Sequence, residues 1–142
     1  MTNWHSYPKV YEIGHPAVKD LLLDPVIVQE KIDGSQWSFG VFDGVLRCRS
    51  HRQEVMLDGR IEPMFQQAVD TARRLAPQLH DGWTYRGEYL EKPHHNALSY
   101  GRVPASNIII FDINIGVEDY LPYGDVLAEA GRVGLEVVPL LM

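Results

Sequence analysis

A single lysine, Lys31, stands between a short apolar run and an Asp-Gly pair, which is a suitable place for a reactive amine. The run from Val26 to Val28 is uninterrupted and β-branched, so it predicts a buried strand. This strand and a tight turn at Asp33-Gly34 would hold the lysine on a rigid element. A lysine ammonium becomes a nucleophile only after it loses its proton, and partial burial or a neighbouring cation makes that loss easier. The alternative is a solvated lysine beside an ordinary hairpin turn.

Arginines that could bind phosphate follow on a predicted β-hairpin. Gln36 to Phe42 alternates polar with apolar residues, and an Asp-Gly turn joins it to Val45 to Arg49, which is a strong hairpin signal. Arg47 and Arg49 share one face of the second strand because side chains alternate, and Arg52 follows closely. A cationic patch near the lysine could therefore hold phosphate. The alternative is a solvated hairpin edge whose basic side chains prevent further pairing.

Two carboxylates are further candidates for contact with a ligand. Glu88 follows Gly87 within a strand predicted from Trp83 to Leu90, and a glycine weakens a strand interior unless something approaches the backbone closely. The gap could admit a ribose or a metal ion, whereas the alternative is an edge strand with a bulge. Asp112 comes at the end of the apolar strand predicted from Asn107 to Ile113, where an unpaired buried charge is costly. We therefore expect this carboxylate to face a site or to have a partner.

A long connection from Glu91 to Ser106 contains many turn residues and side chains able to contact a ligand. It includes the adjacent pair His94 and His95. Two neighbouring histidines in a loop, with no cysteine or carboxylate cluster nearby, are weak evidence for a metal site. We therefore assign no protein metal ligand from the sequence.

The remaining pattern predicts a sheet with two helices. Apolar residues recur at helical spacing from Arg60 to Leu79, and a weaker helix is predicted from Pro122 to Gly134. Leu135 to Leu141 is predicted to be a final strand, and residues 1–25 are expected to lie on the sheet as a lead-in with one or two helical turns. The expected fold class is therefore α+β, a twisted and mostly antiparallel sheet with one longer and one shorter helix.

Length and composition fit one ordinary globular domain over residues 1–142, with 45% hydrophobic and 23% charged residues. A formal net charge of -6 excludes a broadly basic nucleic-acid surface, so any phosphate binding must be local. A single cysteine, Cys48, excludes an internal disulfide and suits a reducing cytosol. No segment approaches the length of a membrane span and the first residues lack a secretion signal, so we expect a cytoplasmic protein.

Four short motifs occur in order, Glu30-Lys31-Ile32-Asp33-Gly34, Arg49-Ser50-His51-Arg52, Arg86-Gly87-Glu88 and Phe111-Asp112-Ile113. In this order and at this spacing they resemble the covalent nucleotidyltransferases, in particular the phage-type RNA ligase 2 branch of the ATP-dependent polynucleotide ligases. The resemblance spans residues 26–141. It implies a nucleotidyltransferase fold of the ATP-grasp-like kind, in which packed helices flank antiparallel sheets and the nucleotide groove lies between sheets.

The resemblance also implies an activity. Lys31 would attack the α-phosphate of ATP, expel pyrophosphate and form a lysyl-AMP phosphoramidate, while Mg²⁺ and cationic side chains balance the phosphoryl charge. The AMP would then pass to a 5′-phosphate end of RNA, where a 3′-hydroxyl would seal the strand. The implied nucleotide-binding residues are Glu30 beside the adenine, Arg52 or Arg49 at the ribose or phosphate, Glu88 at the ribose, Phe111 stacked on the adenine, and Asp112 in support of that pocket.

The chain departs from the family after the fourth motif. The family continues to a Glu-Gly-apolar metal-binding motif and then to a Lys-x-Lys motif, and neither occurs here, where no lysine follows Lys92. The resemblance therefore covers the N-terminal two-thirds of an adenylyltransferase domain, incomplete at its C-terminus. A separate C-terminal polypeptide could supply the missing motifs, and we expect weak or absent self-adenylylation by this chain alone.

Other interpretations stay open at this point. An ATP-dependent DNA ligase or a GTP-using capping enzyme also carries Lys-x-Asp-Gly. A non-catalytic nucleotide- or RNA-binding remnant would bind ATP without forming a covalent adduct. A purely structural domain would show no rise in melting temperature with ATP.

Overall fold

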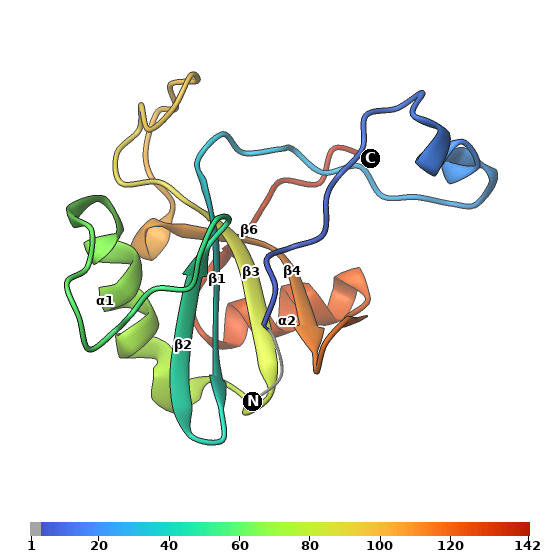
Figure 1. Ribbon diagram of the computed structural model, residues 1–142. Helices are drawn as coiled ribbons and strands as arrows, with labels where there is room; N and C mark the ends of the chain where they lie inside the picture. Colours follow the sequence, from blue (N-terminus) through green and yellow to red (C-terminus); the bar gives the residue numbers. More distant parts are fainter. Residues whose placement is uncertain (1–3) are drawn as a thin grey trace.

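The Asp-Gly hairpin predicted from the sequence forms one edge of a sheet (Figure 1). A computed structural model gives the structure of the protein and describes residues 4–142. Strand β1 (Ser35–Phe42) pairs antiparallel with β2 (Val45–Ser50), and Asp43 and Gly44 turn the chain between them with φ angles of 52° and 79°. Both angles are left-handed, as a tight two-residue hairpin requires, and aspartate and glycine tolerate this conformation.

The sheet is mostly antiparallel. Its order is β2-β1-β3-β4-β5, where β3 is Trp83–Tyr89, β4 is Ile108–Ile115 and β5 is Asp119–Tyr120. The short strand β6 (Glu136–Val137) pairs parallel to β4. The α+β class and the strands predicted around β3 and β4 are thus confirmed. The expected groove between two sheets is wrong for residues 4–142, because these six strands form a single sheet.

Both helices lie against this sheet (Figure 1). Helix α1 (Gln66–Leu75) contacts β1 and β2, and α2 (Tyr123–Arg132) contacts β4 and β6. Each helix has 10 residues, so the longer helix expected from Arg60 to Leu79 is wrong at its ends. Pro63 and Pro77 belong instead to 3₁₀ turns that flank α1, because proline lacks the backbone N–H that an α-helix interior needs.

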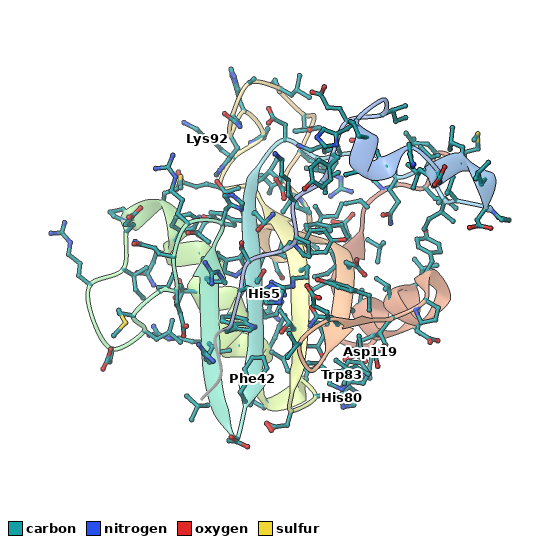
Figure 2. The ribbon with its side chains drawn as sticks, turned by 45° about the vertical axis from the view of Figure 1, so that its right-hand side comes forward. His5, Phe42, His80, Trp83, Lys92 and Asp119 are labelled. Atoms are coloured by element: carbon teal, nitrogen blue, oxygen red, sulfur yellow. The ribbon has the colours of Figure 1, made fainter. Side chains whose placement is uncertain are left out.

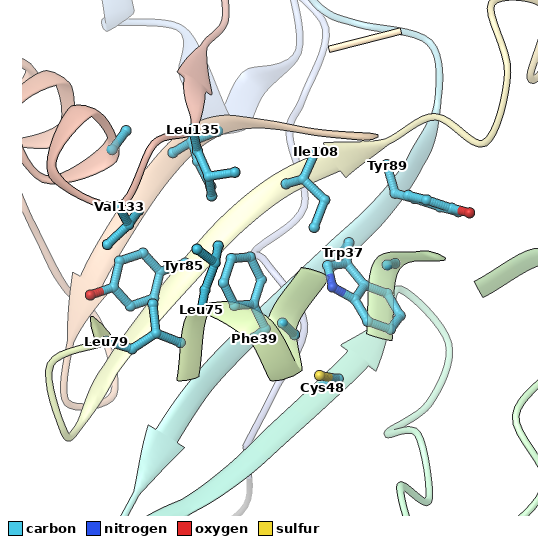
Figure 3. Packing of buried hydrophobic residues seen from close by; sticks show 14 of the residues in the cluster. Trp37, Phe39, Cys48, Leu75, Leu79, Tyr85, Tyr89, Ile108, Val133 and Leu135 are labelled. Carbon is cyan, nitrogen blue, oxygen red and sulfur yellow. The ribbon is translucent and has the colours of Figure 1, made fainter. Parts of the chain in front are cut away.

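The hydrophobic core lies between the helices and one face of the sheet (Figure 3). Trp37 and Phe39 of β1 and Tyr85 and Tyr89 of β3 alternate onto this face and are fully buried. Trp37 stacks on Phe65 with ring centroids 5.3 Å apart, and Phe39 stacks on Tyr85 at 5.5 Å. The intervening residues of the same strands therefore point to the opposite face, which we call the polar face.

A β-bulge in β4 interrupts this alternation. Arg86 pairs with Asp112 whereas Gly87 pairs with Ile110, so Phe111 is the extra residue of the bulge. Phe111 and Asp112 are adjacent in sequence, yet both line a cavity on the polar face. The bulge therefore brings an aromatic ring and a carboxylate to the same place.

The same bulge accounts for Gly87. A Cβ at this position would lie 2.7 Å from the carbonyl oxygen of Ile109 and 3.0 Å from the side chain of Ile108, so the close approach of β4 requires glycine. Strand β3 lies between β1 and β4, so the edge-strand alternative for Glu88 is wrong. The sequence predicted that this strand ends near Asp112, but β4 continues to Ile115.

The apolar run before Lys31 lies beside the last residues of the chain, outside the sheet (Figure 1). Val26, Ile27 and Val28 are 38%, 50% and 37% exposed, so the predicted buried strand is wrong. The backbone N–H of Val28 donates to the carbonyl of Met142 at 2.8 Å, and that of Leu141 donates to Val28 at 2.7 Å. The final strand was predicted from Leu135 to Leu141, but β6 covers only Glu136–Val137. The last residues of the chain pair instead with the segment around Val28.

Most of the described lead-in does not lie on the sheet. Residues 8–17 and 19–28 are exposed, and two 3₁₀ turns, Pro16–Val18 and Leu21–Leu23, form within this arm. The expected helical turns are therefore present, and the hydrogen bonds that join the described lead-in to the strands of the sheet come from residues 4–7. Within residues 4–142, no helix combines the length and apolar character needed to cross a lipid bilayer.

Candidate functional site

The polar face of the sheet carries a cavity of about 420 Å³, a size typical of small-molecule sites. Its walls come from β1, β3 and β4, from the segment before β1, and from the N-terminal residues that cross the sheet. The cavity brings together residues that lie in three separate sequence motifs. Its lining residues are Tyr7, Val10, Gln29, Glu30, Lys31, Ile32, Gln36, Glu88, Phe111, Asp112 and Val138.

Lys31 lines this cavity with an exposed side chain, so the expected partial burial is not found. Its backbone is nevertheless held in place. Gln29 forms an isolated antiparallel bridge with Leu140, and the N–H of Glu30 donates to the carbonyl of Pro139 at 2.9 Å. The lysine therefore projects from a braced extended segment and not from a strand of the sheet.

Negative charge predominates in the cavity. Lys31 is the only cation among the described residues that line it, whereas Glu30, Glu88 and Asp112 contribute three carboxyl groups. The phosphates of a nucleotide would be repelled by these carboxylates unless cations come from elsewhere. The charge of the site therefore limits what this chain can bind by itself.

Glu88 occupies an environment that favours its neutral form. Burial raises the pKa of Glu88 to about 7, although the backbone N–H of Gly34 and the charge of Lys31 act in the opposite direction. Its register partner on β1 is Gln36, which also lines the cavity. Near neutral pH this carboxyl group is therefore divided between its protonated and ionised forms, and it can donate as well as accept a hydrogen bond.

Phe111 and Asp112 contact the same side chain from the N-terminal segment. The ring of Phe111 meets the ring of Tyr7 edge to face, with centroids 4.8 Å apart. Asp112 accepts hydrogen bonds from the Tyr7 hydroxyl at 2.7 Å and from the N–H of Ile113 at 3.0 Å. Burial raises the pKa of Asp112, and these hydrogen bonds together with the charge of Arg86 limit the rise.

Two residues on the polar face received no role from the sequence. Tyr7 lies in the lead-in, where no local pattern marks it. Arg86 is 1% exposed and donates hydrogen bonds to Asn114 at 3.0 Å and to Ser38 at 2.9 Å. Its alternation with Glu88 along a predicted strand was the signal that could have placed it on the same face.

The sequence predicted a cationic patch of hairpin arginines near the lysine, but the structure does not bring them together there. Arg47 pairs with Glu54, and Arg49 donates to the main chain of the N-terminal segment. Neither lines the cavity that contains the lysine. Arg52 is exposed and lines a neighbouring cavity of about 510 Å³, which shares Gln36 with the first. Arg52 is therefore better placed than Arg49 to reach a ligand.

The loop after β3 docks on the segment that follows the lysine. The carboxylate of Asp33 accepts a hydrogen bond from the N–H of Leu98 at 2.8 Å, and His95 Nε2 lies 2.9 Å from the hydroxyl of Ser35. His94 is exposed, whereas His95 is partly buried and also accepts a hydrogen bond from the N–H of Glu91 at 3.0 Å, so the two side chains lie in different surroundings. Residues 4–142 contain no group of three or more histidine, cysteine, aspartate or glutamate side chains able to hold a metal ion.

Comparison with known protein families shows to which family this chain belongs. The family model described as RNA ligase matches residues 24–142. This chain belongs to the RNA ligase family. Comparison with curated proteins gives no match.

Solved structures share the fold of this RNA ligase family member. An archaeal ATP-dependent RNA ligase has a TM-score of 0.58 and 17% identity, covering 82% of this chain and 31% of that chain. A Naegleria gruberi RNA ligase with PPi has a TM-score of 0.56 and 20% identity, covering 82% of this chain and 36% of that chain. At such identities the likeness concerns the fold, and the present chain spans about a third of the length of these proteins.

Proposed function

We propose that this RNA ligase family chain is the nucleotide-binding part of an ATP-dependent RNA ligase, in which Lys31 becomes linked to AMP. The main support is that Lys31, Glu88 and Phe111, from three separate motifs, line one cavity. An amine can attack a phosphate, a partly protonated carboxyl group can hydrogen-bond a ribose, and an aromatic ring can stack on a base. These three functions are the ones that covalent nucleotide transfer requires.

In the proposed first step, Lys31 Nζ loses a proton to solvent, which reaches this exposed side chain, and then attacks the α-phosphorus of ATP. A nitrogen–phosphorus bond forms, the bond from the α-phosphorus to the bridging oxygen breaks, and pyrophosphate leaves with that electron pair. An oxygen of the 5′-phosphate of an RNA end would next attack the same phosphorus and form a phosphoanhydride bond. The nitrogen–phosphorus bond would break, and the lysine amine would leave and take a proton from solvent. A 3′-hydroxyl would then displace AMP and seal the strand.

The other residues implied by the motifs are assigned roles consistent with their positions. Glu30 and Phe111 would contact the adenine, and Asp112 would support that part of the cavity. Arg52 is preferred to Arg49 as the contact to ribose or phosphate, because Arg49 already donates to the main chain of the N-terminal segment. Each assignment is part of the proposal.

The deficit of positive charge in the cavity bears on how ATP would be held. Mg²⁺ bound to the phosphates of ATP would supply part of the missing charge, because the described lining of the cavity contributes a single cation. We propose that a separate polypeptide with basic side chains supplies the remainder. Without it, Lys31 would react slowly.

The test combines an assay of ATP binding with an assay of covalent labelling. The isolated chain is incubated with Mg²⁺ and α-labelled ATP, denatured and analysed for bound label, while equilibrium dialysis measures ATP binding. We expect ATP binding by the wild type and by Lys31→Ala, with weak or absent covalent label on the wild type. A polypeptide that carries the Glu-Gly and Lys-x-Lys motifs should increase labelling of the wild type and of the exposed-loop control Lys92→Ala, but not of Lys31→Ala.

The outcomes separate the candidate functions. Absence of ATP binding to the wild type would contradict the proposal, and rapid labelling of the isolated chain would contradict the argument from charge. ATP binding that never leads to labelling would favour a non-catalytic nucleotide- or RNA-binding protein, an alternative that the single cation in the cavity supports. Comparison of ATP with GTP, and of nicked RNA with nicked DNA, distinguishes an RNA ligase from capping enzymes and DNA ligases.

A further inference from the structure

The N-terminal strap, which we define as residues 4–10, crosses the polar face of the sheet. Figure 2 shows His5 of this strap in front of the strands. The indole N–H of Trp4 donates to Thr84 Oγ1 at 3.0 Å, and the main-chain carbonyls of Trp4 and His5 accept hydrogen bonds from Arg49 and Arg86. These bonds fix the first residues of the strap, so the residues that follow are directed toward the cavity.

Tyr7 is the residue of the strap that meets the two residues of the bulge. Its hydroxyl donates to Asp112 Oδ2 at 2.7 Å, and its ring lies edge to face with Phe111, with centroids 4.8 Å apart and planes at 88°. On another side its ring meets that of Tyr120 at 5.6 Å. Tyr7 therefore links the strap, β4 and β5 at the wall of the cavity.

We propose that Tyr7 is a positioning residue for the nucleotide, which holds the ring of Phe111 and the carboxylate of Asp112 in the orientation that the base meets. This inference rests on the proposed function of the cavity. Phe111 is the extra residue of a bulge and is only partly buried. Part of its surface packs against the apolar cluster of Ile32, Leu90, Ile109 and Val138, and the ring of Tyr7 supplies a further contact. If the contact were removed, the ring would have to be ordered when ATP binds, which would weaken affinity by about two- to tenfold.

The hydrogen bond from Tyr7 also acts on the charge of Asp112. The groups that face this carboxylate are Tyr7 from the strap, Arg86 from β3 and Tyr120 from β5. A donated hydrogen bond stabilises the ionised carboxylate, so its loss makes protonation of Asp112 easier. Removal of the hydroxyl should therefore move the pH dependence of ATP binding to higher pH.

Three variants test the inference. Tyr7→Phe removes the hydroxyl and keeps the ring, Tyr7→Ala removes both, and Tyr11→Phe is the matched control, because Tyr11 contacts His15 in the arm and does not line the cavity. The dissociation constant for ATP with Mg²⁺ is measured by equilibrium dialysis from about pH 5 to about pH 9, on either side of neutrality. Circular dichroism verifies that each variant is folded.

We expect Tyr7→Ala to bind ATP about two- to tenfold more weakly, Tyr7→Phe to show the shifted pH dependence, and Tyr11→Phe to match the wild type. A purely structural role of Tyr7 would lower the melting temperature without moving the pH dependence of ATP binding. If the wild type binds ATP, and both Tyr7→Phe and Tyr7→Ala bind ATP with the same affinity as the wild type at every pH, this inference alone is overturned. If the wild type binds no ATP, both the inference and the proposed function are overturned. Tyr7→Phe is nearly isosteric, so it remains informative even if Tyr7→Ala does not fold.

Discussion

Replacing Glu88 by glutamine is expected to raise the free energy of unfolding at alkaline pH and to leave it nearly unchanged at acidic pH. Burial raises the pKa of Glu88 from 4.5 to about 7 in the folded protein. Between these two values the folded state binds more protons at this site than the unfolded state, so the stability of the wild type falls as the pH rises through this window. Glutamine is neutral at every pH and nearly the same size, so the variant avoids this loss.

The two pKa values set the size of the effect. At about 1.4 kcal/mol for each pH unit, the difference between 4.5 and about 7 corresponds to about 3 kcal/mol. Because part of the Glu88 side chain still meets solvent, we expect about 2 kcal/mol after screening. This is a considerable fraction of the net stability of a typical domain.

Urea unfolding at about pH 4 and about pH 8.5, on either side of this window, measures the effect directly. With a slope of about 2 kcal/mol per molar urea, the midpoint of Glu88→Gln should exceed that of the wild type by roughly 1 M at the higher pH and should match it at the lower pH. Glu12→Gln is the matched control, because Glu12 is exposed in the arm and does not line the cavity.

The difference between variant and wild type isolates Glu88 from any other group that titrates over the same range. If the urea midpoints of Glu88→Gln and the wild type differ by the same amount at both pH values, the reasoning is refuted. It would mean that this carboxyl group ionises as freely as one in solvent. The same result would remove the argument that Glu88 is partly protonated when it meets a ribose.

Two further predictions concern the bulge and the arginines. Gly87→Ala places a Cβ 2.7 Å from a backbone carbonyl oxygen, so it should lower stability by about 2 kcal/mol and the melting temperature by about 6 °C. Gly124→Ala meets no neighbouring atom within 4 Å and should leave the melting temperature equal or higher. Equal melting temperatures for the two variants would contradict the tight contact at Gly87. Arg49→Ala should destabilise the protein by about 2 kcal/mol, because its hydrogen bond to the strap is lost. Arg52→Ala should change stability by less than about 0.5 kcal/mol and should weaken ATP binding. Urea unfolding measures the stability and equilibrium dialysis measures the binding, and the reverse pattern would exchange the roles assigned to the two arginines.

Local patterns were sufficient for the elements with strong signals along the chain. The Asp43-Gly44 hairpin follows from alternation and turn chemistry, and the centre of α1 follows from helical spacing of apolar residues. The order of the motifs favoured the RNA ligase family over the DNA ligases and capping enzymes that share its first motif, and the family model that matches residues 24–142 confirms it. In each case the determining information lies within short stretches of sequence, so no knowledge of distant contacts was needed.

Features that depend on pairing between distant segments were not accessible in this way. The apolar run from Val26 to Val28 has the composition of a buried strand, but it pairs with the last residues of the chain outside the sheet and remains exposed. Arg49 was one of two arginines expected to contact ribose or phosphate, but its side chain donates to the carbonyl of Trp4 in the strap. Composition records the propensity of a segment, whereas burial depends on which other segment covers it.

The sequence by itself determined the family, the α+β class and the candidate residues Lys31, Glu88 and Phe111. The tertiary structure alone decided that Phe111 and Asp112 face the same cavity, because alternation assigns neighbouring residues to opposite faces until a bulge changes the register. It also decided the contact of Tyr7 with Asp112, which lie 105 positions apart in the chain. No local rule specifies such a contact, since it exists only when the strap folds back across the sheet.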